Sequence, residues 1–134
     1  MAKIERFEDI DAWREARVLV KCVYRLTNEG LFARDYGLRD QIRRAAVSIM
    51  SNIAEGFERG GSKEFRHFLF VAKASAAEVR SQVYVAFDLG YIDDGSFKEL
   101  YSRLITISQK LAGFIKYLQM LEPRHQPTNQ RSPS

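Results

Sequence analysis

Residues 97–121, FKELYSRLITISQKLAGFIKYLQML, repeat their apolar side chains with the period of an α-helix. The steps alternate between three and four residues, which is the spacing of a coiled-coil-like seam. Asp93 or Asp94 can cap the start of this helix, and Pro123 cannot continue it beyond its end. The eight members of the seam are Phe97, Leu100, Leu104, Ile107, Leu111, Phe114, Leu118 and Leu121.

Three earlier segments have the same helical period. They span about Asp9–Asn28, Tyr36–Phe57 and Ser62–Leu89, and the first residue of the last segment is its expected N-cap. Gly30 and Gly90 follow the first and third segments, where a glycine commonly ends a helix. No window alternates with period two for long enough to indicate a strand. The core face of the first segment is expected to carry Ala12, Trp13, Ala16, Leu19, Val20, Val23 and Tyr24.

Short connections between long helices make consecutive helices antiparallel neighbours. The pattern therefore predicts an all-α fold, an antiparallel up-down-up-down four-helix bundle. A chain of 134 residues fits a single domain, which we expect to span residues 1–121. Residues 122–134 are polar and contain Pro, Gln, Asn and Ser, so we expect them to form a disordered C-terminal tail.

The composition excludes several classes of protein. A single cysteine, Cys22, excludes an intramolecular disulfide framework and a multi-cysteine metal site. No apolar run has the length of a signal peptide or of a membrane span, which favours a soluble cytoplasmic protein with no membrane partner. The net charge of +4 is spread along the chain, without the block of like charge that is typical of a basic tail.

The second and third helices are more apolar than a lone bundle requires. Their apolar side chains cover about twice the arc of one core-facing stripe, and large exposed apolar patches usually mark interfaces. We therefore expect a homo-oligomer; the alternative is a loose bundle with scattered apolar side chains on its surface. The candidate interface residues are Val47, Met50, Ala54 and Phe57 on the second helix and Phe70, Ala74, Ala77 and Tyr84 on the third.

Basic side chains gather into two stripes. The third helix interleaves cations with aromatic rings in the order Arg66, Phe70, Lys73, Ala77, Arg80 and Tyr84. Cations release counterions from phosphates, and aromatic rings can stack on unpaired bases. The alternative is that the Arg and Lys stems cover apolar surface while their charged groups stay in water. The stripe on the first helix consists of Arg14, Arg17, Lys21 and Arg25.

The motifs for catalysis and metal binding are weak. Di-iron bundles need a Glu-x-x-His pair on each of two helices, and only Glu64–His67 provides one inside a predicted helix. Residues 56–63, GFERGGSK, lack the residue order and the preceding strand of a phosphate-binding loop. With one cysteine and two histidines, no nucleophile and base are arranged for catalysis. We expect no enzyme activity, no metal, no cofactor and no small-molecule substrate.

Two polar residues of the third helix, Ser75 and Gln82, fall on its apolar seam. Buried polar groups need hydrogen-bond partners, so these side chains are expected to pair inside the bundle. A polar layer that sets the register of the helices is favoured over a ligand site.

Several segments of the chain carry a family resemblance: Tyr36-Gly37-Leu38, Gln41–Ile49, Ser51–Gly56, Lys63-Glu64-Phe65, Phe68-Leu69, Ser75, Glu78, Gln82 and Leu89-Gly90-Tyr91. Through them the chain resembles the 23S rRNA intervening-sequence protein family over roughly residues 4–121. The resemblance implies a cytosolic bacterial four-helix bundle that assembles as a ring-like homopentamer; the residues themselves leave the number of copies open. Some members are encoded inside insertions in 23S ribosomal RNA genes, and the family has no accepted catalytic residues.

Together these observations favour a non-enzymatic homopentameric scaffold that binds ribosomal or other structured RNA through phosphate contacts. The alternative is a protein–protein adaptor that does not bind nucleic acid. The candidate RNA-binding residues are Arg14, Arg17, Lys21, Arg25, Arg43, Arg44, Lys73 and Arg80.

Overall fold

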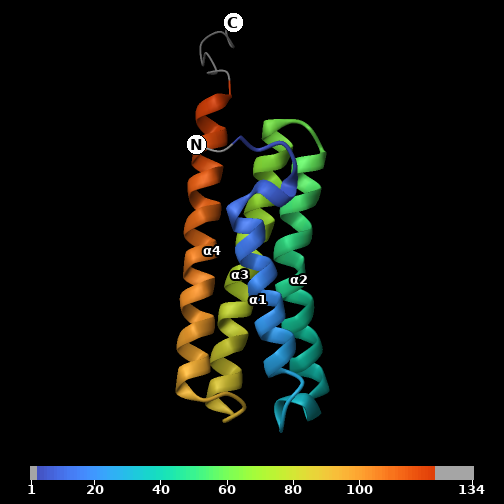
Figure 1. Cartoon of the computed structure of the whole chain (residues 1–134), viewed down its shortest axis with the longest axis vertical. Helices are drawn as coiled ribbons and strands as arrows, with labels where there is room; N and C mark the ends of the chain where they lie inside the picture. The colour runs from blue at the N-terminus through green and yellow to red at the C-terminus, as the bar shows by residue number, and fades with distance from the viewer. Residues whose placement is uncertain (1–2, 123–134) are drawn as a thin grey trace, which may run out of the picture.

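The structure is a computed structural model that describes residues 3–122. Its long helices lie side by side (Figure 1). The helices are α1 (Asp11–Leu26), α2 (Tyr36–Glu58), α3 (Ser62–Asp88) and α4 (Asp94–Leu121). Two short 3₁₀ turns, η1 (Phe7–Asp9) and η2 (Phe32–Arg34), precede α1 and α2. No strand occurs in residues 3–122, and the predicted up-down-up-down bundle is confirmed. The tail expected at residues 122–134 lies outside the described residues except for Glu122.

Each helix packs on its neighbours along the chain, and α1 closes the bundle by packing on both α2 and α4. This arrangement places α1 and α3 on a diagonal, so their outward faces point in opposite directions (Figure 1). The seam of α4 supplies the centre of the core, where Leu104, Ile107 and Leu111 are fully buried. The last seam residue, Leu121, is instead exposed, because it lies at the free end of the helix.

Three residues that are expected on the core face of the first helix are not fully buried: Val20, which is half-buried against the core, and two aromatic residues. Trp13 is half-buried and packs edge-on against Phe7, at 5.2 Å between ring centroids. Tyr24 is exposed, and its ring lies under the guanidinium of Arg43. Both side chains lie at the edge of the buried stripe, where one helix meets the next.

The helix ends agree in part with the sequence analysis. The Asp93 side chain accepts a hydrogen bond from the Ser96 N–H at 2.7 Å, so the predicted cap of α4 is confirmed. The prediction for Ser62 is wrong: Gly61 occupies the N-cap position of α3, and no side chain caps that end. Gly30 and Gly90 have φ values of 56° and 76°, a left-handed conformation that glycine adopts without strain. Gly90 directly follows Leu89, the C-cap of α3, whereas Gly30 lies in the turn beyond Thr27, the C-cap of α1.

The first helix begins two residues later and ends two residues earlier than expected. Phe7–Asp9 form a separate 3₁₀ turn, and Ile10 is extended before α1 begins. Because α1 starts late, it does not reach the end of the bundle where α2 ends and α3 begins. Residues 3–10 cover that end instead (Figure 1). Ile10 is buried there, although it lies in no helix.

Candidate nucleic-acid interface

The basic and aromatic stripe of α3 lies along the groove between α3 and α4. At one end, Arg66 donates two hydrogen bonds, of 2.8 and 2.9 Å, to the carboxylate of Glu122, which directly follows α4. At the other end, the ring of Tyr84 contacts Phe97 and Tyr101 of α4, with centroids 5.1 and 6.1 Å apart. The stripe therefore runs along the side of α3 that faces α4.

The middle of this groove holds a surface hollow of about 350 Å³. Ala74 and Ala77 of α3 and Ser108 of α4 keep it open because their side chains are small. The candidate RNA-binding residues Lys73 and Arg80 line the hollow together with Phe70, a candidate interface residue. We call the surface formed by Phe70, Lys73, Ala74, Ala77, Arg80, Tyr84 and Ser108 the α3–α4 groove.

The two cations of the groove have no acidic partner in the part of the chain that the structure describes. Neither Lys73 nor Arg80 has a carboxylate oxygen within 4.0 Å there. Arg66 differs from them, because its hydrogen bonds hold the pKa of the Glu122 carboxyl below its ordinary value. The positive charges of Lys73 and Arg80 are therefore available to bind an external anion.

The basic stripe of α1 forms a second face on the diagonally opposite helix. Arg14 donates hydrogen bonds to the Asp11 carboxylate at 2.6 Å and to the Glu8 carbonyl at 3.0 Å. Arg17 lies over the Trp13 ring, 5.8 Å from its centroid. Lys21 and Arg25 are exposed, and within residues 3–122 neither has a carboxylate oxygen within 4.0 Å.

Arg43 and Arg44 of α2 have different surroundings. The Nε atom of Arg43 donates to the Thr27 hydroxyl at 2.8 Å, and its guanidinium lies 4.4 Å from the centroid of the Tyr24 ring. These contacts hold α2 against α1, which gives Arg43 a role in packing. Arg44 is exposed and, among the described residues, forms no ion pair.

The eight candidate interface residues do not form one patch in the single chain. The side of α2 that carries Val47, Met50, Ala54 and Phe57 also carries Arg43 and faces α1; Met50 and Phe57 pack partly against the core. The residues of α3 lie instead along α4, and 48% of the surface of both Phe70 and Tyr84 is exposed. Sequence periodicity shows which side of a helix is apolar but not which helix packs against that side. It therefore could not show that the α2 residues and the α3 residues lie on different faces of the bundle.

The polar residues expected in the interior are buried, as predicted. The hydroxyls of Ser75 and Ser48 are hydrogen-bonded at 2.9 Å, and the Asn52 amide donates to Ser48 Oγ at 3.0 Å. Gln82 is only 8% exposed and donates to Glu78 Oε2 at 3.4 Å. Within residues 3–122, Gln82 Oε1 has no hydrogen-bond partner. The hydrogen bond between Ser48 and Ser75 thus links α2 to α3, whereas those of Asn52 and Gln82 stay within their own helices.

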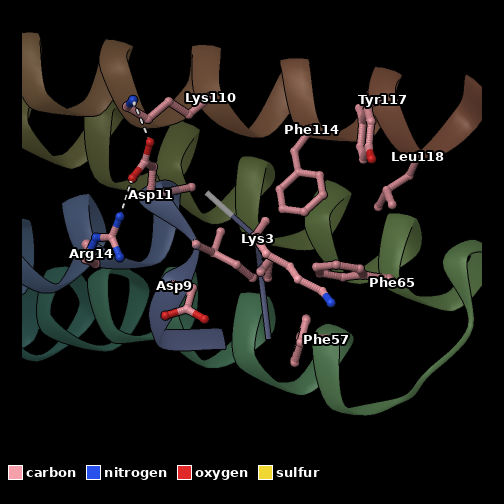
Figure 2. Close-up of a pocket in the computed structure, with 13 residues that line it drawn as sticks. Lys3, Asp9, Asp11, Arg14, Phe57, Phe65, Lys110, Phe114, Tyr117 and Leu118 are labelled. Atoms are coloured by element: carbon pink, nitrogen blue, oxygen red, sulfur yellow. Dashed lines mark hydrogen bonds and ion pairs between the residues drawn. The ribbon is translucent and has the colours of Figure 1, made fainter. Parts of the chain in front are cut away.

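A pocket of about 860 Å³ that the sequence analysis missed lies beside the start of α1 (Figure 2). Figure 2 shows the rings of Phe57, Phe65 and Phe114 around it, one from each of the three helices that extend past α1. At its rim, Asp11 pairs with both Arg14 and Lys110, the latter at 3.8 Å. The pocket exists because α1 starts late, which no local sequence signal reveals.

The Glu64–His67 pair, the one Glu-x-x-His motif inside a predicted helix, does not form a metal site with other residues that the structure describes. Glu64 lies 3.8 Å from Arg59, and His67 is exposed beside the Phe68 ring. Residues 3–122 contain no group of three His, Cys, Asp or Glu side chains that could hold a metal ion. Among the same residues, no helix is both long enough and apolar enough to cross a membrane.

The fold and its surface define a class: small all-α bundle proteins that present cations and aromatic rings in a groove between two helices. A family model described as 23S rRNA-intervening sequence protein matches residues 8–113, and the chain belongs to this family. This match confirms the resemblance seen in the sequence.

A solved structure supports the fold. It is the crystal structure of a protein of unknown function from the S23 ribosomal protein family of Bacteroides thetaiotaomicron. The two structures agree with a TM-score of 0.71 at 20% sequence identity, over 78% of this chain and 95% of that chain. At this identity the likeness shows the shared four-helix fold. A comparison with curated proteins gave no match.

Proposed function

We propose that the protein is a non-enzymatic, cytoplasmic homopentameric scaffold that binds structured RNA through phosphate contacts. The observation that carries the proposal is the presence of cations without acidic partners on two faces of the described bundle. Lys73 and Arg80 lie in the α3–α4 groove, and Lys21 and Arg25 lie on α1. An oligomer would repeat both faces around its ring and so strengthen the field that attracts a polyanion. The family description, which refers to 23S rRNA, supports RNA as that polyanion.

Oligomerisation is supported by the exposed apolar side chains. The candidate contact residues on α3 are Phe70, Ala74, Ala77 and Tyr84, and all four are exposed in the single chain. On α2, Val47 is exposed, while Met50, Ala54 and Phe57 are half-buried. Sedimentation equilibrium of the purified protein tests this part, with five copies per particle as the expected result. A single copy at micromolar concentration would contradict it.

RNA binding is tested by measuring Kd for a structured RNA hairpin across a salt series. The expected affinity is micromolar or tighter at physiological salt and falls steeply as salt rises. Lys21→Gln combined with Arg25→Gln should weaken binding to all sequences about equally and reduce the magnitude of the salt slope by about one for each lost phosphate contact. Arg34→Gln is the matched control, because Arg34 is an exposed cation outside both basic faces. Weak binding that does not change with salt would contradict RNA binding.

A second candidate function is a protein–protein adaptor, and the exposed rings of Phe70 and Tyr84 favour it. An adaptor would have negligible affinity for RNA at physiological salt. It would retain a protein partner in a pull-down, and the partner would be lost when Phe70 is changed to Asp. The salt series therefore separates the two functions before any partner is sought.

A further inference from the structure

The α3–α4 groove presents its rings and cations in a regular order. Along α3 the order is ring, cation, cation, ring: Phe70, Lys73, Arg80 and Tyr84. At a rise of 1.5 Å per residue, the two cations are separated by about 10 Å along the helix and the two rings by about 21 Å. The four side chains thus form a line in a groove whose middle is hollow.

This order matches an unpaired nucleic-acid strand more closely than a duplex. A duplex presents phosphates on its outside, but its bases are stacked inside, so exposed rings find no base face. An unpaired strand exposes both its phosphates and its bases, and base stacking on aromatic rings tolerates any sequence. A stacked strand rises about 3.4 Å per base, so the distance between the rings corresponds to about six nucleotides.

We infer that the α3–α4 groove binds a short unpaired stretch of RNA, with bases stacked on Phe70 and Tyr84 and phosphates at Lys73 and Arg80. This inference rests on the proposed RNA-binding function and assigns it a substrate class, an unpaired segment such as a loop or a bulge. The basic face of α1, which has no comparable row of exposed rings, contributes phosphate contacts that do not depend on base pairing.

The two ends of the groove support this assignment. Arg66 is occupied by Glu122, so the positive charge available in the groove is concentrated at Lys73 and Arg80. The ring of Tyr84 is held edge-on by Phe97 and Tyr101, which leaves a rigid aromatic surface that is about half exposed. A ring fixed in place loses little conformational entropy when a base stacks on it.

A second copy of the chain could pack against the aromatic rings of the groove, but an apolar surface would not neutralise the charges of Lys73 and Arg80. An apolar partner surface would bury Lys73 and Arg80 without an anion, which is unfavourable. A strand of RNA supplies one phosphate per nucleotide along the whole line, which meets both cations at once. For this groove the observations therefore favour RNA over a contact between copies, which leaves the candidate residues of α2, Val47, Met50, Ala54 and Phe57, for the contact between copies. The experiment separates the two uses of the groove.

The test compares a 12-nucleotide unpaired RNA with a blunt duplex of the same sequence, using the full chain. Phe70→Leu and Tyr84→Leu remove the aromatic faces and keep apolar bulk. Each change should weaken binding of the unpaired RNA about fivefold or more and change binding of the duplex less than twofold. Tyr36→Leu is the matched control, because the Tyr36 ring is 65% exposed but lies on α2, outside the groove. Thermal melting confirms that each variant is folded.

The charge variants complete the design. Lys73→Gln with Arg80→Gln should reduce the magnitude of the salt slope for the unpaired RNA by about 0.7 for each lost contact. If the ring variants bind unpaired RNA like the wild type while the charge variants still weaken it, the groove does not stack bases, although the proposed function holds. If no RNA binds at all, both proposals fail. If the charge variants change the number of copies and leave RNA affinity intact, the groove is a contact between copies and the inference is overturned.

Discussion

The hydroxyl of Tyr91 donates a hydrogen bond of 2.9 Å to Oδ2 of Asp35. The other oxygen of the same carboxylate accepts from the Leu38 N–H at 3.1 Å and so caps the start of α2. The Tyr91 ring also packs on Phe32, with centroids 5.3 Å apart. The Asp35 side chain therefore links the α3–α4 connection to the α1–α2 connection, although Asp35 and Tyr91 are 56 residues apart in the sequence.

Replacing Asp35 should destabilise this end of the bundle. Asp35→Ala removes the cap of α2 and leaves the Tyr91 hydroxyl without its acceptor, at an expected cost of about 1–2 kcal/mol. Tyr91→Phe should cost less, because the cap remains. Urea unfolding of both single variants and the double variant measures the coupling between the two side chains. Strictly additive effects would show that the hydrogen bond does not contribute to stability.

The hydrogen bond to Asp35 raises the pKa of the Tyr91 hydroxyl above its ordinary value of 10.0. Because folding favours the neutral phenol, this contribution is complete below pH 10 and is lost as the pH rises through the pKa of the folded state. Alkaline melting of the wild type should therefore include a loss of stability that Tyr91→Phe lacks. Parallel declines of the two proteins between pH 9 and pH 11 would refute this contribution.

Two helical glycines should respond in opposite directions to the same substitution. A Cβ at Gly56 would lie 2.6 Å from the Cβ of Phe68 and 3.0 Å from Cδ1 of Phe65, so α2 and α3 would have to move apart. Gly56→Ala should cost about 1–3 kcal/mol despite the better helix propensity of alanine. At Gly113 a Cβ meets no atom within 4 Å, and Gly113→Ala should stabilise the protein by about 0.5–1 kcal/mol. Chemical denaturation of both variants measures the change in the free energy of unfolding, which should fall for Gly56→Ala and rise for Gly113→Ala.

Trp13→Ala should destabilise the bundle by about 2 kcal/mol. A fully buried tryptophan would cost about 3–5 kcal/mol, but Trp13 is half-buried against Phe7 and Arg17. Because Trp13 is the only tryptophan, circular dichroism rather than fluorescence must follow unfolding of this variant. A fully buried site, Leu104→Ala, gives the comparison, with an expected cost of about 2–5 kcal/mol. A larger cost at Trp13 than at Leu104 would contradict its placement at the edge of the core.

The contact between Arg66 and Glu122 should depend on pH. Hydrogen bonds from Arg66 hold the pKa of the Glu122 carboxyl below its ordinary value of 4.5. The stabilisation is therefore present above pH 4.5 and is lost as the pH falls through the lower pKa of the folded state. Glu122→Gln should lower the melting temperature at pH 7 and have less effect at pH 2. Glu29→Gln, which changes an exposed carboxyl with no ion pair in residues 3–122, is the control. A constant difference at both pH values would rule out the ionic contribution.

Much of the fold could be predicted from the spacing of apolar residues. The seam that includes Leu104 and Leu111 indicates a helix and its buried face, because side chains three and four residues apart lie on the same side of a helix. Gly90 marked the end of α3 for an equally local reason, because glycine adopts a left-handed backbone conformation without strain. The family was also recognisable from the sequence, and the family match confirms it.

Other features follow only from how the helices pack. Periodicity placed Lys73, Arg80 and Tyr84 on one stripe, but only the tertiary structure shows that α4 lies beside this stripe and makes it a groove. The same holds for Arg43, which the sequence analysis grouped with RNA-binding cations and which the structure places against Thr27. It holds too for the pocket left by the late start of α1. Local sequence determines which side of a helix is apolar, whereas the neighbour of each side depends on contacts between residues far apart in the chain.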